Sequence, residues 1–488
     1  MNQLNILFIF CDQLRADALG KDCGGTGWVN TPSLDRVGRE AIRFERAYTN
    51  SPVCVPARMS MATGLYPHSH GYWSNNAPGP IGEQSESHAL DPEWPTWMSH
   101  IRDSGYRTAL FGKTHLHQHI GDLRDREDLM KAYGWDHIDE IGGPRASARI
   151  GSHMNDVWKE AGLQEAYIED YRDRYSTKIP PIRPSVLPLE LYADTYVGQR
   201  AKSWLEDVGE DQPWMTWVSF GGPHEPWDTP EPYASKYAFE DMPSPLPLPS
   251  WMDEQDVDCS HRRSLRKWKK SLDGEGGMSE EHIKKLRANY AGNVELIDNQ
   301  VGQILETLES RGLMENTIIV FSADHGEMNG DMGMLHKGNF FESACRIPFL
   351  IRIPKLKKGG AEVSLAPVEL MDIGATLCDL VNLPWEGYHF SRSLKAHIEG
   401  KEAGPSLAMS EHAGDLMICD GKHKMIVNPN GDPCLLFDLE SDPGESTNIL
   451  GIVKNIEIQS SLEKLWAKRM LSTQLQCPGP RGYIWQMK

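Results

Sequence analysis

The sequence predicts an α/β protein with a smaller C-terminal subdomain, and two patterns carry this prediction. Four short apolar segments, at 4–11, 107–111, 214–220 and 317–323, run without interruption and are each followed at once by polar residues. Uninterrupted apolar strands suit a sheet that helices cover on both faces. After about residue 384 the pattern changes to short strand-like pieces separated by Gly, Asn and Pro turns, which is typical of antiparallel sheet.

Helical patterns lie between these strands. Apolar side chains from Leu286 to Leu308 recur at helical spacing over roughly six turns. A second helix is predicted over 368–380, and Pro384 bars its continuation. The chain is therefore divided into a catalytic domain, 1–383, and a C-terminal subdomain, 384–488. We expect that subdomain to contain short antiparallel strands and a terminal helix.

Composition narrows the function classes. The 488 residues carry 50 Lys and Arg against 69 Asp and Glu, a net charge of −19, which argues against a general nucleic-acid binder. The nine cysteines are scattered without zinc-type spacing. The N-terminus does not resemble a signal peptide, and no apolar stretch reaches the ~18–20 residues of a membrane span. These features predict a cytoplasmic protein that is not associated with a membrane.

Polar residues at the ends of the predicted strands indicate a metal site. Asp12 and Gln13 follow the first strand, and Asp324 and His325 follow the last. In open α/β sheets, ligands bind just beyond the carboxyl ends of the strands. A lone Asp is most often a turn or capping residue, but several at one rim favour a site for Ca²⁺, Mg²⁺ or Mn²⁺.

Cationic side chains are predicted at the same rim, and such a cluster can bind a tetrahedral oxyanion. The candidates are Arg58, Lys113, His115, His224 and Lys337. Taken singly, each of them reads as an ordinary surface residue. The alternation of His115, His117 and His119 resembles a zinc site, but no Cys or further His has matching spacing.

The most specific pattern surrounds Cys54, which is followed by Pro56, Arg58 and then Thr63-Gly64. From the residues alone, this cysteine is either a buried inert thiol or a thiolate activated at a helix N-terminus. The pattern resembles the signature of the formylglycine-dependent sulfatases of the alkaline-phosphatase-like superfamily, and of the related phosphonate monoester hydrolases. Six further segments resemble these families in the same order, at 12–17, 111–115, 223–227, 322–327, 333–348 and 436–445.

The resemblance implies a large mixed, mostly parallel sheet flanked by helices. It also implies that a formylglycine-generating enzyme converts Cys54 to formylglycine, whose hydrate attacks the sulfur of a sulfate ester. A divalent metal, Ca²⁺ with Mg²⁺ or Mn²⁺ as alternatives, would bind sulfate oxygens and lower the pKa of the nucleophile. The implied metal ligands are Asp12, Gln13, Cys54, Asp324 and His325.

The resemblance also assigns catalytic roles. Asp324 would accept or share the proton of the nucleophile, and Arg58 would hold the hydrate against the metal. Lys113 and Lys337 would neutralise charge on the sulfate. His224, with Lys337, would protonate the leaving alcohol. His115 would then deprotonate the remaining hydroxyl, so that the hemiacetal sulfate collapses to the aldehyde and inorganic sulfate.

Two alternatives stay open at this stage. Gln13 replaces an aspartate found in many sulfatases and is common among phosphonate hydrolases, so a phosphonate monoester or phosphodiester hydrolase with the same nucleophile is the nearest rival. Lys113 and His115 favour the sulfatase, because phosphonate-hydrolysing relatives tend to carry Thr and Tyr there. A non-catalytic anion-binding protein on this fold is the remote alternative, and its sign would be an unmodified thiol at Cys54.

The sequence leaves the substrate itself open. A small sulfated sugar, aryl sulfate or alkyl sulfate is expected, and the sequence leaves the oligomeric state open, with a homo-oligomer as one alternative. Four residues are predicted to contact the substrate because they follow the nucleophile segment or His224 closely: Trp73, Asn75, Asn76 and Trp227. Core packing is the ordinary alternative for the two tryptophans.

Overall fold

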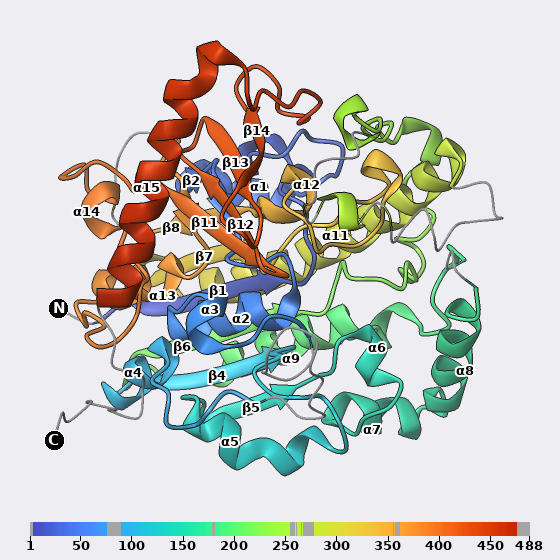
Figure 1. Ribbon diagram of the computed structural model, residues 1–488. Coiled ribbons are helices and arrows are strands. Elements are labelled where there is room, and N and C mark those ends of the chain that lie inside the picture. Colours follow the sequence, from blue (N-terminus) through green and yellow to red (C-terminus); the bar gives the residue numbers. More distant parts are fainter. Residues whose placement is uncertain are drawn as a thin grey trace, which may run out of the picture.

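A mixed sheet forms the centre of the molecule (Figure 1). The computed structural model describes residues 3–75, 89–177, 181–253, 259, 261–264, 266, 278–354, 356 and 362–475. Within these residues the sheet has eight strands. In spatial order they are β5 (His137–Glu140), β4 (Arg107–Gly112), β6 (Trp214–Phe220), β1 (Asn5–Cys11), β7 (Thr317–Ala323), β8 (Phe349–Arg352), β2 (Ile42–Phe44) and β9 (Glu362–Ser364).

The five strands from β5 to β7 run parallel, whereas β8 is antiparallel to both of its neighbours. All four strands expected from the sequence are present, and they lie side by side as β4, β6, β1 and β7. The side chains of β1, β6 and β7 are buried throughout, as expected for a sheet covered on both faces. The predicted α/β fold class is therefore confirmed.

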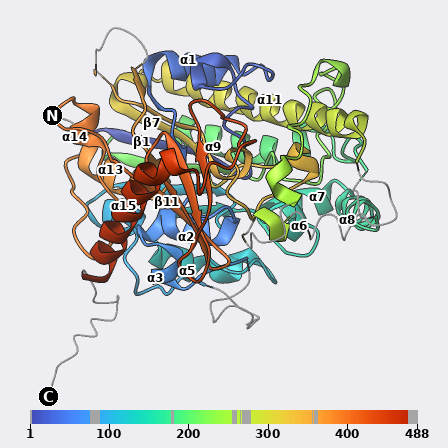
Figure 2. The same cartoon turned by 45° about the horizontal axis from the view of Figure 1, so that its top comes forward.

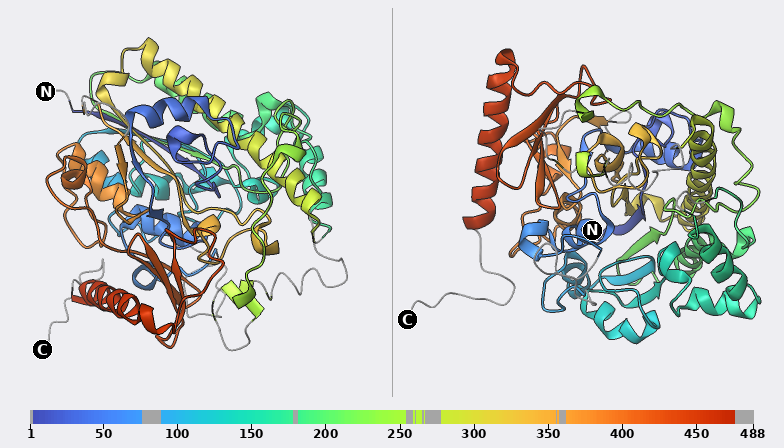
Figure 3. Two further views of the ribbon diagram at one scale, coloured as in Figure 1. Left: turned by 90° about the horizontal axis from the view of Figure 1, so that it is seen from above. Right: turned by 45° about the vertical axis from the view of Figure 1, so that its right-hand side comes forward.

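Helices cover both faces of this sheet (Figure 3). On one face α9 (Ala193–Asp207) packs against α11 (Glu280–Ser310), and Trp204 of α9 contacts Phe111 of β4 with ring centroids 6.1 Å apart. On the other face lie α2 (Cys54–Thr63), α4 (Trp97–Asp103) and α13 (Asp372–Leu380). There Trp97 contacts Phe8 of β1 at 6.0 Å. None of the described helices combines the length and apolarity that a membrane span requires.

The remaining helices are short connections around the sheet. They are α1 (Pro32–Glu40), α3 (Pro67–His70), α5 (Glu127–Ala132), α6 (Pro144–Ser147), α7 (His153–Glu160), α8 (Gln164–Arg174), α12 (Glu342–Cys345) and α14 (Lys395–Ile398). The helix predicted over 368–380 begins later, at Asp372. Its first residues instead form β10 (Val368–Glu369), which pairs with β3 (Ala47–Tyr48), because the backbone N–H of Val368 donates to the chain at Arg46.

The C-terminal part forms a separate antiparallel sheet, as predicted (Figure 2). Its strands are β11 (Ala408–His412), β12 (Asp415–Cys419), β13 (His423–Val427) and β14 (Pro433–Asp438), and α15 (Ile456–Leu475) packs on β12 and β13. Tyr66 and Met371 join Met409 and Leu462 in one apolar cluster. Because this cluster crosses the predicted boundary at residue 383, the division into two domains stays a prediction.

The parallel strands bring the predicted polar segments together at one edge of the sheet. The N–H of Asp12 donates to the carbonyl of Gly222 over 3.1 Å, and the N–H of Asp324 donates to that of Cys11 over 3.2 Å. The N–H of Lys113 likewise donates to Ser219 over 2.9 Å. The hydrogen-bond register of the sheet therefore fixes the relative positions of residues that are far apart in the chain.

Candidate active site

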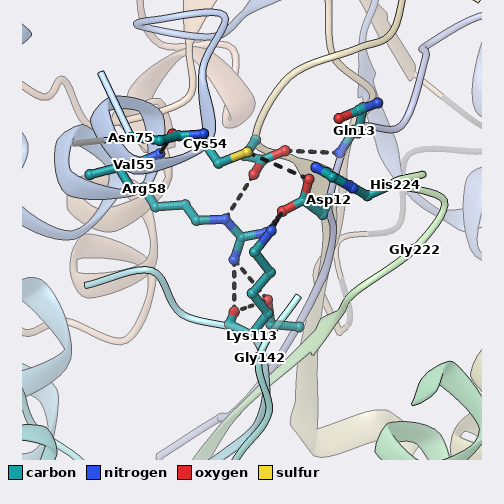
Figure 4. Close-up of polar contacts among 12 residues, drawn as sticks. Asp12, Gln13, Cys54, Val55, Arg58, Asn75, Lys113, Gly142, Gly222 and His224 are labelled. Atoms are coloured by element: carbon teal, nitrogen blue, oxygen red, sulfur yellow. Dashed lines mark hydrogen bonds and ion pairs between the residues drawn. The ribbon is translucent and has the colours of Figure 1, made fainter. Parts of the chain in front are cut away.

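Cys54 is the first residue of α2, and its side chain lies beside the acidic residues at the sheet edge (Figure 4). Its Sγ is 3.2 Å from Nε2 of His325 and 3.8 Å from Oδ1 of Asp12. Burial raises the pKa of the Cys54 thiol, but the charges of Lys337, Lys113 and His325 outweigh it and hold that pKa well below its ordinary value. The positive end of the helix dipole also favours an anion at this position.

Asp12, Cys54, Asp324 and His325 form a group that fits a divalent metal ion. One potential ligand atom from each residue lies within 4.8 Å of the others, and all four side chains are buried. The carboxylate oxygens of Asp12 and Asp324 are donors that suit Mg²⁺, Mn²⁺ or Ca²⁺, and His325 adds one nitrogen donor. Four of the five predicted metal ligands are thus brought together.

Gln13, the fifth, places its side chain in a different set of contacts. Its Nε2 donates to Glu225 over 2.8 Å and also to Glu327, and its Oε1 accepts from Lys337. Its backbone N–H donates to Oδ1 of Asp324 over 3.0 Å. The backbone of Gln13 is left-handed, with φ +66°, a conformation that non-glycine residues adopt mainly at functional or strained positions. The backbone N–H of Gln13 therefore binds Asp324, and its side-chain amide links the site to two buried glutamates.

Arg58 lies beneath the site, with no exposed surface. Its Nε donates to Oδ2 of Asp324 over 2.8 Å, and its terminal nitrogens donate to Oδ2 of Asp12 over 3.2 Å and to the carbonyl of Lys113 over 2.7 Å. Burial opposes its charge, but Asp324 and Asp12 raise the pKa of Arg58 above its ordinary value. Arg58 thus neutralises the two carboxylates and attaches α2 to the loop after β4.

The loop after β4 places Lys113 and His115 at the site. Nζ of Lys113 lies 2.5 Å from Oδ2 of Asp12. Burial and the charge of Lys113 hold the pKa of His115 well below its ordinary value, so its imidazole is neutral. His115 also has a left-handed backbone, with φ +55°.

A buried cluster around Glu140, at the end of β5, supports this loop. The Oε2 of Glu140 is 2.8 Å from Nε2 of His117, and its Oε1 is 3.3 Å from Nε2 of His119. The hydroxyl of Thr114 donates to the same carboxylate. Glu140 therefore binds three residues that flank or alternate with His115. The histidine alternation seen in the sequence is explained by this cluster.

A cavity of about 650 Å³ opens over these residues. Six predicted site residues line it: Cys54, Asn75, Lys113, His115, His224 and Lys337. His224 places Nδ1 2.7 Å from the carbonyl of Glu225, which leaves its Nε2 for the cavity. Asn75 also supports α2, because its Oδ1 accepts from the N–H of Val55 over 3.0 Å.

Neither of the two predicted tryptophan contacts is among the described residues that line the cavity. Trp227 is only 3% exposed, and its ring stacks on His336 with centroids 5.9 Å apart, so it packs in the interior behind the cavity wall. Trp73 is half-buried outside the described lining of the cavity. Asn76 lies outside the described residues. Core packing thus accounts for the position of Trp227.

Three buried glutamates at the site were not predicted. Glu225 follows the predicted His224 and Glu327 lies two residues after the predicted His325, both inside segments that the resemblance covered, so the sequence offered a signal for both. Glu140 carried no such signal, because it lies in a strand with little apolar character. The residues that surround and support the site therefore include more carboxylate side chains than the motifs indicated.

A family model described as sulfatase matches residues 4–383. The chain therefore belongs to the sulfatase family, which makes it a sulfuric ester hydrolase by class.

Curated relatives agree with this membership. The chain is similar to a choline-sulfatase of Rhizobium meliloti (strain 1021), with 29% identity over 91% of this chain and 82% of that protein. It is also similar to an arylsulfatase of Clostridium perfringens, with 28% identity over 96% of this chain and 94% of the relative. The fold resembles that of a phosphonate monoester hydrolase from Silicibacter pomeroyi, with a TM-score of 0.77 and 24% identity over 98% of this chain and 97% of that one.

Proposed function

We propose that this protein hydrolyses a sulfate monoester to an alcohol and inorganic sulfate, with Cys54 converted to formylglycine as the nucleophile. The observation that carries the proposal is the position of Cys54. It is the first residue of a helix, it lines the cavity together with Lys113, His115 and Lys337, and it lies in contact with the candidate metal ligands. The relatives whose names include sulfatase support the same reaction.

Four side chains would hold the metal, and one of them is the nucleophile itself. Asp12, Asp324, His325 and the oxidised Cys54 offer the ligand atoms, and we propose Ca²⁺, with Mg²⁺ or Mn²⁺ as alternatives. When formed and bound, the formylglycine hydrate supplies a nucleophilic hydroxyl and the metal supplies positive charge near the sulfate oxygens. Arg58 holds Asp12 and Asp324 in position for this task.

The remaining residues act on the sulfate and the leaving group. Lys113 and Lys337 line the cavity near Cys54, where their charges stabilise the sulfate as negative charge develops. In the proposed step the nucleophilic hydroxyl would bond to sulfur and pass its proton to Asp324, while the bond from sulfur to the alcohol oxygen breaks. The alcohol oxygen would keep the electron pair of the broken bond and take a proton from Nε2 of His224. His115, which is neutral, accepts the proton of the remaining hydroxyl so that sulfate is expelled.

A phosphonate monoester or phosphodiester hydrolase is the second candidate. The fold similarity to a phosphonate monoester hydrolase and the presence of Gln13 favour it. Lys113 and His115, which both line the cavity, favour the sulfatase. Maturation by a formylglycine-generating enzyme, a cytoplasmic location and a homo-oligomeric state stay predictions.

The test is a ratio of kcat/KM values for nitrophenyl sulfate and a nitrophenyl phosphonate, measured on protein co-expressed with a formylglycine-generating enzyme and supplied with Ca²⁺ or Mn²⁺. We expect sulfate to be preferred. Mass spectrometry of the peptide that contains Cys54 should show the aldehyde, and Cys54→Ala should lose turnover while it keeps the wild-type melting temperature. Preference for phosphonate would overturn the substrate class, and turnover by Cys54→Ala would overturn the nucleophile.

A further inference from the structure

The cavity over Cys54 is much larger than a sulfate group needs, and one of its walls is formed by the segments 118–121 and 143–149. At about 650 Å³ it falls in the range of pockets that enclose a whole small molecule. The alcohol part of the substrate therefore lies inside the cavity, and the side chains of this wall determine which alcohols fit.

Two arginines from this wall line the cavity, and they differ in their pairing. Arg145 is engaged: it pairs with Glu225 and its guanidinium lies 5.1 Å from the ring centroid of Tyr175. Arg149 has an exposed side chain and makes no ion pair within the described part of the chain. Arg149 thus gives the cavity a positive charge that no carboxylate of the described residues pairs with.

No carboxylate among the described lining residues is available as a counterion to Arg149. Among the described lining residues, Glu225 is the only carboxylate. It accepts from Gln13 over 2.8 Å, pairs with Arg145, and lies 3.3 Å from the ring nitrogens of both His224 and His336. The cavity is therefore cationic beyond the charges that surround Cys54, in a chain whose net charge is −19.

This lining matches one class of alcohol better than the others. A quaternary ammonium group is usually bound by aromatic rings, yet Phe, Tyr and Trp are absent from the described residues that line the cavity. A guanidinium, in contrast, presents a planar pair of donors that matches a carboxylate or a sulfate.

We infer that the natural substrate is a sulfate ester whose alcohol carries a second anionic group, a carboxylate or another sulfate, and that Arg149 binds this group. The inference rests on the sulfate-ester hydrolysis proposed above and deepens it by naming the substrate class. A sulfated sugar acid and a disulfated sugar both belong to this class. Choline sulfate, which carries a cation, does not.

The experiment compares matched substrates on the mature, metal-loaded enzyme. One arm uses a sulfated uronic acid and the corresponding sulfated neutral sugar, and a second arm uses an amino sugar sulfated at one or at two positions. Nitrophenyl sulfate is the common reference. Because a charge-assisted hydrogen bond is lost without the second anion, we expect kcat/KM to favour the dianion by about 10- to 100-fold in at least one arm. The arm that shows the preference identifies the group as a carboxylate or a sulfate.

Variants assign the preference to Arg149. In Arg149→Gln we expect the dianion-to-monoanion ratio of kcat/KM to fall about 10-fold, mainly through KM, and Arg149→Lys should restore part of it. Arg39→Gln, at an exposed arginine that pairs with Asp22 outside the cavity, is the matched control and should keep the wild-type ratio.

Two results would overturn the inference in distinguishable ways. If nitrophenyl sulfate is hydrolysed but the dianions are not preferred, or the ratio is the same in Arg149→Gln, the second-anion site is wrong and the proposed function stands. Faster turnover of choline sulfate than of every dianion would have the same meaning. If no sulfate ester is hydrolysed, the proposed function falls and the inference falls with it.

Discussion

Nε of Arg58 donates to Oδ2 of Asp324 over 2.8 Å, and neither side chain has any exposed surface. The same guanidinium reaches Asp12. Two carboxylates at the centre of the site are therefore held by one cation from the nucleophile helix α2, and this arrangement joins the metal ligands to Cys54.

Replacing Arg58 tests this arrangement. Arg58→Gln removes the cation of buried Asp324 and leaves Asp12 with Lys113 alone, which should cost about 3–5 kcal/mol of unfolding free energy in metal-free protein. Arg58→Lys keeps the charge but loses the fork of donors, so we expect a smaller loss of stability and still at least a ~100-fold fall in kcat/KM. Denaturant titration and nitrophenyl sulfate kinetics measure the two effects. Wild-type kcat/KM in Arg58→Lys would contradict the assignment.

His224 is predicted to protonate the leaving alcohol, and the nature of that alcohol provides the test. His224→Asn should lower kcat/KM by about 100- to 10,000-fold for an alkyl sulfate, whose alkoxide is a poor leaving group. The effect should be much smaller for nitrophenyl sulfate, because nitrophenolate leaves without protonation. The slope of log kcat/KM against the pKa of the leaving alcohol should become steeper in the variant. An equal loss for both substrates would indicate that His224 only binds sulfate.

The strand β5 offers a matched pair of neighbouring carboxylates. Glu140 binds Thr114, His117 and His119, whereas Asp139 accepts from Tyr196 over 3.0 Å and pairs with Arg200 on the other side of the strand. We expect Glu140→Gln to lower kcat by about 10-fold or more, since a small displacement of His115 is costly for catalysis. Asp139→Asn should reduce thermal stability and keep kcat.

A pH profile of kcat distinguishes the positioning of His115 by Glu140 from a general contribution of Glu140 to the structure. If Glu140 positions His115, the profile of Glu140→Gln should change shape along with its height, because the environment of that imidazole changes. A uniform fall with the wild-type profile, or an equal fall in Asp139→Asn, would indicate a general loss of structure.

Asp228 predicts a pH dependence of stability. Burial raises the pKa of this carboxyl from 3.8 to about 6, with the charge of Arg174 opposing the shift. Between these two pH values the folded chain keeps a proton that the unfolded chain has lost, so the unfolding free energy falls as the pH rises from about 4 to about 6.

Asp228→Asn removes this contribution. Relative to wild type, the variant should therefore gain up to about 3 kcal/mol in unfolding free energy between pH 4 and pH 7. Urea titrations at both pH values measure the difference. The same difference between variant and wild type at both pH values would contradict the raised pKa.

Sequence patterns predicted the elements of the core well. The four strands were expected within a residue of their ends, because apolar runs and the polar residues after them mark where a buried strand stops. The helix expected over 368–380 began four residues late, since its first residues pair with β3, and pairing with a distant segment leaves no local signal.

Tertiary structure decided the surroundings of the site. Gln13 lies 314 residues from Glu327 in the chain, yet their side chains are hydrogen-bonded. No periodicity or motif around Gln13 could predict that its amide would be held by two glutamates and Lys337.

The sequence by itself determined the fold class. It also singled out five residues that the structure groups at the edge of the sheet, because each adjoins a strand end or belongs to a local motif: Asp12, Cys54, Arg58, Asp324 and His325. Only the tertiary structure decided that Glu140 binds Thr114 and His117 on either side of His115, that Trp227 is buried, and that Arg149 lines the cavity. The physical reason is the range of the interactions. Local patterns fix where strands and helices end, whereas the layer around a site forms from loops that only strand order and chain packing bring together.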